Sequence, residues 1–155
     1  MELPKRRTIR LAPAVYSEAG RAFSATVGTF PRTGIFLDID FGLACVRLLS
    51  ELSARRQNRV FAYCLMPDHV HLLVESRADS PLSSFVGAWK SRCYRERRRR
   101  GNGQPFWQRS FYDHALRAEE DLHAAALYIL SNPVRRGFVE DFHDYPLCGS
   151  FVFDL

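Results

Sequence analysis

Two runs of strand-forming residues, separated only by the dipeptide Pro67-Asp68, constrain the fold of this chain more than any other feature. The first run covers residues 60–66 and the second covers residues 69–75. Proline and aspartate are common in tight turns, and so short a connection lets the two strands lie antiparallel. We therefore predict a β-hairpin over these residues.

The second strand of this hairpin has two chemically different faces, because successive side chains of a strand point to opposite sides. One face carries only apolar residues, at positions 70, 72 and 74, and is a core face. The other face carries His69, His71 and Leu73. Two imidazoles with mostly apolar neighbours require an explanation.

A strand and a helix are predicted before the hairpin. Residues 21–30 are rich in strand formers and are closed by Pro31. Either Asp38 or Asp40 can cap a helix that ends near the pair Arg55-Arg56.

A helix, a strand and a second helix are predicted after the hairpin. Ser80, followed by a proline, is a good helix start with the serine as cap, and an amphipathic stripe follows it. Residues 106–114 predict a further strand, and residues 119–132 predict the last helix. Pro133 is expected to stop that helix, and residues 134–155 are expected to form an irregular tail.

The order strand–helix–strand–strand–helix–strand indicates an α+β, ferredoxin-like or RRM-like fold, in which helices pack on an antiparallel sheet. With 155 residues, 46% of them hydrophobic, the chain is expected to form one domain over residues 1–155, with a core at about 21–145, a basic N-terminal arm and the irregular tail.

The composition also suggests where the protein works. Charges interrupt every apolar stretch, so we expect no membrane span, and no signal-peptide region follows the basic N-terminus. The four cysteines are scattered without a Cys-x-x-Cys pair, which is typical of reduced thiols. We therefore expect a cytoplasmic protein.

Positive charge is concentrated in one segment, residues 90–109. It holds eight basic residues against the single acid Glu96, so its charge is +7; with a net charge of +5, the remaining chain sums to −2. Such a field attracts polyanions, and the guanidinium fork matches phosphate oxygens. A solvated helix end is the alternative interpretation. The candidate DNA-binding residues are Lys90, Arg92, Arg95, Arg97, Arg98, Arg99, Arg100 and Arg109.

His69 and His71 are candidate ligands of a metal ion. Their positions lie roughly 7 Å apart along the strand, which is two strand rises, so the two imidazoles can converge on one ion. Two histidines need at least one further ligand and leave coordination positions open, as catalytic metal sites do. With a phosphate substrate, Mg²⁺ or Mn²⁺ is the expected ion. The alternative is a pair of hydrogen-bonded structural histidines, but burying both without a partner would be costly.

Tyr128 and Asn132 lie four residues apart on the last predicted helix, and so on one helical face. A tyrosine can act as a nucleophile when a neighbouring group assists it, and the Asn132 carboxamide could add an oxygen ligand. The alternatives are a tyrosine packed at the helix rim and an asparagine that ends the helix before a proline. The residues alone do not favour Tyr128 over other tyrosines such as Tyr63, Tyr94 and Tyr112.

Three blocks of the sequence, taken together, resemble one family. They are residues 66–74 (MPDHVHLLV), 106–114 (FWQRSFYDH) and 128–137 (YILSNPVRRG), and they occur in the family's order. The chain resembles the IS200-like single-tyrosine transposases with a His-hydrophobe-His site, and in particular their relatives associated with repeated extragenic palindromes (REP). Asp68 departs from the asparagine that is common there, and residues 145–150 match the family's C-terminal ending only in part.

The resemblance implies a specific activity. His69 and His71 would bind the divalent metal, with Asn132 as third ligand. Tyr128 would attack single-stranded DNA beside a hairpin, leaving a 5′-phosphotyrosine link and a free 3′-hydroxyl, and the reverse attack would rejoin strands without a nucleotide cofactor. The family includes dimers that exchange tyrosines, so a homodimer is one expectation. The alternative is a catalytically silent protein of the same fold that binds single-stranded or hairpin nucleic acid through its arginines and aromatic residues.

Overall fold

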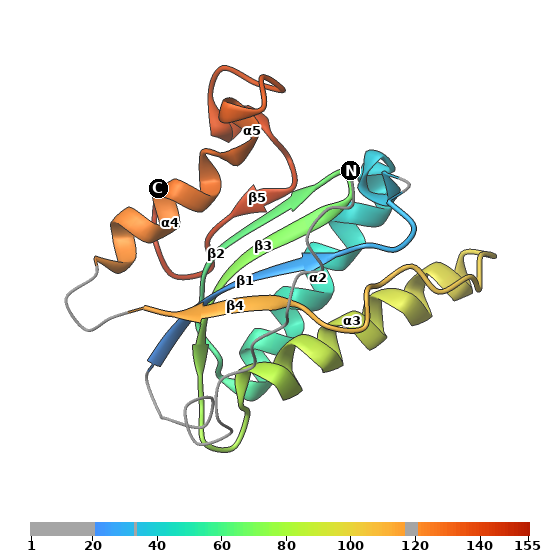
Figure 1. Cartoon of the computed structure of the whole chain (residues 1–155), viewed down its shortest axis with the longest axis horizontal. Coiled ribbons are helices and arrows are strands. Elements are labelled where there is room, and N and C mark those ends of the chain that lie inside the picture. The colour runs from blue at the N-terminus through green and yellow to red at the C-terminus, as the bar shows by residue number, and fades with distance from the viewer. Residues whose placement is uncertain (1–20, 33, 117–120) are drawn as a thin grey trace, which may run out of the picture.

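A five-stranded antiparallel sheet forms the centre of the protein (Figure 1). The computed structural model describes residues 21–32, 34–116 and 121–155. The strands lie in the order β4-β1-β3-β2-β5. Their bounds are Arg21–Gly28 (β1), Val60–Met66 (β2), His69–Ser76 (β3), Tyr112–Ala115 (β4) and Cys148–Gly149 (β5). The first four strands have the predicted ferredoxin-like arrangement, and the hairpin β2-β3 is confirmed.

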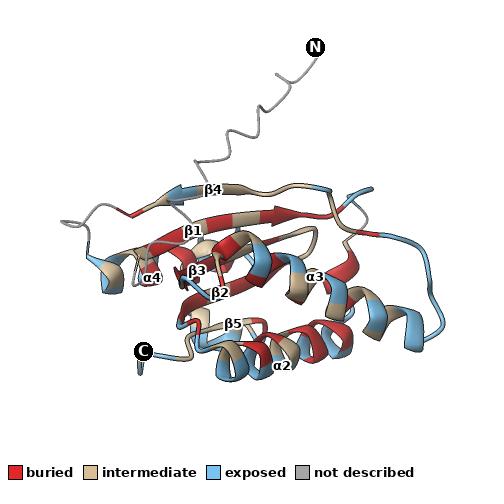
Figure 2. Cartoon of the chain, turned by 90° about the horizontal axis from the view of Figure 1, so that it is seen from below, coloured by how far each residue is buried: buried red, intermediate tan, exposed pale blue. Residues whose placement is uncertain are grey.

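Helices cover both faces of the sheet. Helices α2 (Ile39–Arg56) and α3 (Leu82–Arg99) pack on one face, and α4 (Leu122–Leu130) packs on the other. Figure 2 shows the sides of α2 and α3 that face the sheet as buried and their outer sides as exposed. The structure also contains α5 (Asn132–Arg135) and two 3₁₀ turns, η1 (Ile35–Leu37) and η2 (Phe142–Asp144). None of the helices in the described residues is long and apolar enough to cross a membrane.

The predicted alternation of β3 is confirmed by its packing. Val70, Leu72 and Val74 are fully buried in the core beneath α2 and α3. Leu73 belongs to a second core, beneath α4. Each fully buried Val or Leu side chain stabilises the fold by roughly 1.5–3 kcal/mol, so the register of β3 is strongly determined. His69 and His71 share the side of Leu73, which is the α4 side of the sheet.

The two predicted helix starts have different outcomes. Of the two predicted caps, Asp38 is the one that caps α2, because its carboxylate accepts from the Phe41 backbone N–H at 3.1 Å, while Asp40 lies in the first turn. The prediction that Ser80 caps α3 is wrong. The Ser80 backbone pairs with Arg77 in a turn, so the helix begins later, and the Leu82 N–H donates to the Ser76 hydroxyl at 3.2 Å instead.

The C-terminal part is more ordered than predicted. Pro133 does not stop the helical path, because it lies in the first turn of α5, where a missing N–H costs little. The prediction of an irregular tail over residues 134–155 is also wrong. Residues 142–144 form a 3₁₀ turn, β5 pairs with β2, and Leu147 is fully buried in the core beneath α2 and α3.

Candidate active site

The two histidines of β3 lie close together on the α4 side of the sheet. Their ring centroids are 4.8 Å apart, and the ring planes are nearly perpendicular, at 88°. Both side chains are half-buried. The pair therefore forms the compact group of imidazoles that the alternation predicts.

Each histidine is oriented through the same ring atom. The Nδ1 atom of His69 lies 2.7 Å from Asp68 Oδ1, and the Nδ1 atom of His71 lies 3.3 Å from Thr26 Oγ1. When both Nδ1 atoms carry the proton, the two oxygens accept, and each Nε2 keeps its lone pair. Metal-binding histidines commonly donate their other N–H to an oxygen in this way. The pair therefore fits a divalent cation held through the two Nε2 atoms.

Burial, helped by the charges around the pair, keeps His71 uncharged at neutral pH. Burial lowers the pKa of His71 to about 4, and the charges of His69, Arg135 and Arg136 act in the same direction. The hydrogen bond with His69, rather than the more distant Arg32, is the largest cause that lowers the pKa of Asp68. A neutral imidazole is the form that binds a metal ion.

The orienting residues were missed by the sequence analysis. The sequence indicates Asp68 only as a turn residue, although it directly precedes His69. Thr26 reaches His71 because β1 pairs with β3 in a register that sets these two residues opposite each other, 45 positions apart in the chain. No local pattern could indicate that partner.

Helix α4 brings Tyr128 to the same side of the sheet. The helix buries Ala126, Ile129 and Leu130 against β2 and β3, while Tyr128 is 68% exposed. The guanidinium of Arg135 lies 4.1 Å from the Tyr128 ring centroid and donates to the Tyr128 carbonyl at 2.9 Å. Tyr128 is thus an accessible phenol beside a cation.

Other tyrosines can be compared with Tyr128. Tyr63 packs on the core beneath α2 and α3, on the face opposite to the histidines. The hydroxyls of Tyr94 and Tyr145 donate to the backbone carbonyls of Gly103 and Leu65, respectively, at 2.7 Å each. Tyr112 is different. It pairs with Thr26 across β4 and β1, so its side chain is on the face that carries the histidines. Tyr112 is therefore the tyrosine from which Tyr128 has to be distinguished.

Asn132 is engaged within its own helical turn. Its Nδ2 donates to the Ile129 carbonyl at 2.8 Å, and its Oδ1 accepts from Arg135 at 2.9 Å. Arg135 therefore competes with a cation for the Asn132 Oδ1. Among the residues that the structure describes, no group of three or more His, Cys, Asp and Glu side chains could hold a metal ion. Asn132, the third ligand that the resemblance implies, is an amide and so is not one of these residue types.

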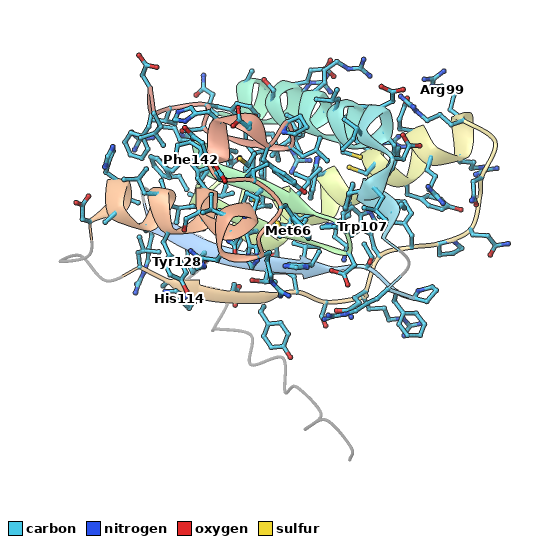
Figure 3. All side chains as sticks on the ribbon, turned by 90° about the horizontal axis from the view of Figure 1, so that it is seen from above. Met66, Arg99, Trp107, His114, Tyr128 and Phe142 are labelled. Atoms are coloured by element: carbon cyan, nitrogen blue, oxygen red, sulfur yellow. The ribbon has the colours of Figure 1, made fainter. Side chains whose placement is uncertain are left out.

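The basic segment lies on the other layer of the molecule. It begins on α3, which covers the face opposite to the histidines, and Figure 3 shows Arg99 at the other end of the molecule from Tyr128. Arg99 and Arg100 form ion pairs with Glu96, and the hydrogen bond from Arg99 is the largest cause that lowers the pKa of Glu96 to about 2. Arg97 lies over the rings of Phe41 and Phe106.

The remaining basic residues differ in exposure. Arg92 is half-buried, and Lys90 is half-buried with its Nζ donating to the Gln108 carbonyl at 2.5 Å. Arg95, Arg98 and Arg109 are exposed. The eight basic residues therefore do not form one uniform surface, which their closeness in the sequence had suggested.

Comparisons with known proteins agree with this fold. The chain is 30% identical over 96 residues to a Haemophilus influenzae protein named as a candidate REP-associated tyrosine transposase. That alignment covers 55% of this chain and 54% of the relative, so the chain spans about half the length of the curated relative it matches.

Two solved structures are similar. A REP-associated tyrosine transposase bound to a REP hairpin is 24% identical, with a TM-score of 0.71 over 86% of this chain and 78% of that one. A candidate transposase from Deinococcus radiodurans is 20% identical, with a TM-score of 0.52 over 72% of this chain and 88% of that one. At these identities, the two structures establish the fold alone.

The family comparison covers most of the elements described above. The model of the family described as "Transposase IS200 like" matches residues 32–132, which is more than half of the chain and includes the histidine pair, α3, β4 and α4. The chain therefore belongs to the IS200-like transposase family.

Proposed function

We propose that this protein cuts and rejoins single-stranded DNA next to a hairpin, with Tyr128 as the nucleophile and a divalent metal ion held by His69 and His71. The observation that carries the proposal is the matched orientation of the two imidazoles. Both use Nδ1 in a protein contact and leave Nε2 for a cation. A structural pair would have no need to keep the same ring atom available on both rings.

The expected cofactor is Mg²⁺ or Mn²⁺, the cations usual at phosphate-transfer sites. When bound, such an ion neutralises charge on the scissile phosphate and makes it a better electrophile. Asn132 is the proposed third ligand, and Arg135, which donates to its Oδ1, would compete with the ion. The neutral state of His71 at physiological pH suits this role.

The chain's own residues supply the covalent step. The Tyr128 oxygen forms a bond to phosphorus and loses its proton to solvent, and the bond from phosphorus to the 3′-oxygen breaks. The 3′-oxygen takes up a proton, so the products are a 5′-phosphotyrosine link and a free 3′-hydroxyl. Arg135, stacked on the tyrosine ring, holds the phenol and presents a positive charge to the incoming phosphate. Attack of a 3′-hydroxyl on the phosphotyrosine reverses the step.

The hairpin substrate is proposed by analogy with the similar solved protein, which is bound to a REP hairpin. Arginines of the basic segment would track the phosphates of that hairpin, since their contact needs no particular base. Arg95, Arg98 and Arg109 are the exposed members that could do so without breaking an ion pair.

The test is formation of a covalent adduct. Labelled hairpin DNA with a single-stranded flank, incubated with the protein and Mg²⁺ or Mn²⁺, is expected to give a protein–DNA adduct that resists denaturant. Tyr128→Phe should abolish the adduct, and Tyr112→Phe should retain it. Tyr112→Phe is the matched control, because both changes remove one hydroxyl on the same side of the sheet. An adduct that persists in Tyr128→Phe and disappears in Tyr112→Phe would transfer the role to Tyr112.

A second candidate function is hairpin or single-strand binding without catalysis. One observation favours it: Arg135 occupies the oxygen of Asn132, the position at which a third ligand is proposed. Hairpin binding that is unaffected by metal ions, with no adduct under any condition, would support this function.

A further inference from the structure

A groove lies between α3 and the edge of the sheet, on the side away from the histidines. Its volume is about 420 Å³, and its lining includes Gly87, Lys90, Tyr94, Arg95, Trp107 and Arg109. Small-molecule sites commonly measure roughly 300–1,000 Å³, so the groove has the size of a site for one nucleotide and is too small for a duplex.

The groove is basic. Three of its lining residues are cationic, and no acidic residue lines it. Arg95 and Arg109 are exposed, and within the described residues neither forms an ion pair, in contrast to Arg99 and Arg100. Their guanidinium groups are therefore available to an anion such as a phosphate.

Two aromatic rings in the groove are held in place by hydrogen bonds. The Trp107 indole N–H donates to the Lys90 carbonyl at 3.0 Å, and the Tyr94 hydroxyl donates to the Gly103 carbonyl at 2.7 Å. Trp107 also packs on Trp89, with ring centroids 5.5 Å apart. Rigid aromatic rings beside cations are the features on which the bases of a single strand stack.

One edge connects the groove with the histidines. The Gln108 N–H donates to the Gly28 carbonyl at 3.0 Å, and Gly28 pairs with His69 on the next strand. The groove edge is thus two strand spacings, about 10 Å, from His69. The Gln108 side chain lies over Gly28, because a Cβ atom built on Gly28 would meet the Gln108 Oε1 at 2.5 Å. Gly28 is paired with His69, so that Cβ atom would be on the face of the sheet that carries the histidines.

We propose that this groove binds one unpaired nucleotide of the DNA strand that is cut, with its phosphate on Arg95 and Arg109 and its base against Trp107. The inference rests on the proposed function. A strand leaving the groove over Gln108 reaches the histidines on the other face. The groove therefore contributes to the choice of the cut position relative to the hairpin.

Gly87 offers a clean way to block the groove. It is exposed on α3, and a Cβ atom added there would meet nothing within 4 Å. Gly87→Glu fills the groove with an acid and also replaces a poor helix former by a better one, so the variant should fold at least as well as the wild type. Ser50→Glu, at an exposed position of α2, adds the same charge outside the groove and is the matched control.

The experiment measures binding of tetrathymidylate to the full chain in the presence of a chelator. Wild type and Ser50→Glu are expected to bind alike, with quenching of the emission of Trp107, whereas Trp89 is fully buried. Gly87→Glu should weaken binding by about tenfold or more through charge repulsion. Arg95→Ala should lower the slope of log affinity against log salt by about 0.7, as expected for one lost phosphate contact on a single strand.

Unchanged affinity in Gly87→Glu, no detectable binding by the wild type, or unchanged tryptophan emission at saturation would each overturn the proposal. Because no metal or cleavage is involved, these outcomes are independent of the adduct assay. Groove binding with no adduct would count against the proposed function alone, and an adduct with unimpaired Gly87→Glu binding would count against the groove alone.

Discussion

At the scale of single residues, the orientation of His69 depends on the side chain that precedes it. The Asp68 carboxylate accepts from Nδ1 at 2.7 Å and thereby selects the tautomer with a free Nε2. Asp68 has no place in the proposed chemistry of the phosphate. It is a positioning residue, and its contribution should appear in metal binding.

Asp68→Ala should weaken Mn²⁺ binding by roughly 10–100-fold, the usual effect of losing such an orienting partner. Asp68→Asn should restore most of the affinity, because its amide oxygen can still accept from Nδ1. Titration calorimetry or the electron paramagnetic resonance signal of Mn²⁺ measures this without DNA. Equal affinities in the wild type and Asp68→Ala would show that Asp68 does not orient a ligand.

The residue scale also shows the limit of local patterns. The facing of His69 and His71 follows from strand alternation, and it is confirmed. The contacts of Thr26 with His71 and of Arg135 with Tyr128 and Asn132 were not predicted. The first depends on strand register, and the second depends on how the chain turns between α4 and α5.

At the scale of elements, the C-terminal segment is part of the fold. Its two-residue strand β5 is too short to produce a recognisable alternation, so the sequence predicts only an irregular tail. Yet the Leu147 carbonyl accepts from the Leu65 N–H at 2.8 Å, and the Leu147 side chain lies against Gly42 of α2. The segment closes the open edge of β2.

Leu147→Ala should therefore destabilise the protein by about 2–5 kcal/mol, the usual range for a buried leucine truncation. Val152→Ala is the control, because Val152 belongs to the same segment but is 41% exposed and should cost less than about 0.5 kcal/mol. Chemical denaturation followed by circular dichroism gives both values. A loss below 0.5 kcal/mol for Leu147→Ala would mean that the segment detaches readily.

The helices and strands also place the residues of the basic segment in different surroundings. The basic segment is contiguous in the chain, but α3 and the strand edge place its members differently. Some are paired with Glu96, one lies on aromatic rings, and others face the groove. Net charge predicted a polyanion partner and could not indicate which arginines remain available.

At the scale of the whole molecule, the packing of α4 bears on whether the proposed nucleophile Tyr128 acts with the histidines of its own chain. The helix lies on β2 and β3 of its own chain through Ala126, Ile129 and Leu130. Separating it would expose these buried apolar side chains, at a cost of roughly 25 cal/mol for each Å². We therefore expect the tyrosine and the histidines of one chain to act together.

A mixing experiment tests this expectation. Tyr128→Phe and the double variant His69→Ala/His71→Ala should each be inactive, and an equimolar mixture should stay inactive if the site is formed within one chain. Adduct yield on hairpin DNA is the measurement, with wild type diluted to the same site concentration as the reference. Recovery of a substantial fraction of wild-type adduct in the mixture would instead indicate a dimer that exchanges tyrosines.

The sequence by itself determined the hairpin, the facing of the histidine pair, the ferredoxin-like order of the elements and the presence of a strong basic segment. These follow from alternation, helical periodicity and charge, which act over a few neighbouring residues. Only the tertiary structure decided the partners of the histidines, the place of Tyr112 beside Thr26, the engagement of Asn132 and the groove at α3. The contact of Thr26 with His71, the place of Tyr112 and the groove depend on register and packing between residues far apart in the chain. The contacts of Asp68 with His69 and of Asn132 with Arg135 join residues close in the chain, but they depend on how the backbone turns there, which no alternation or periodicity predicts.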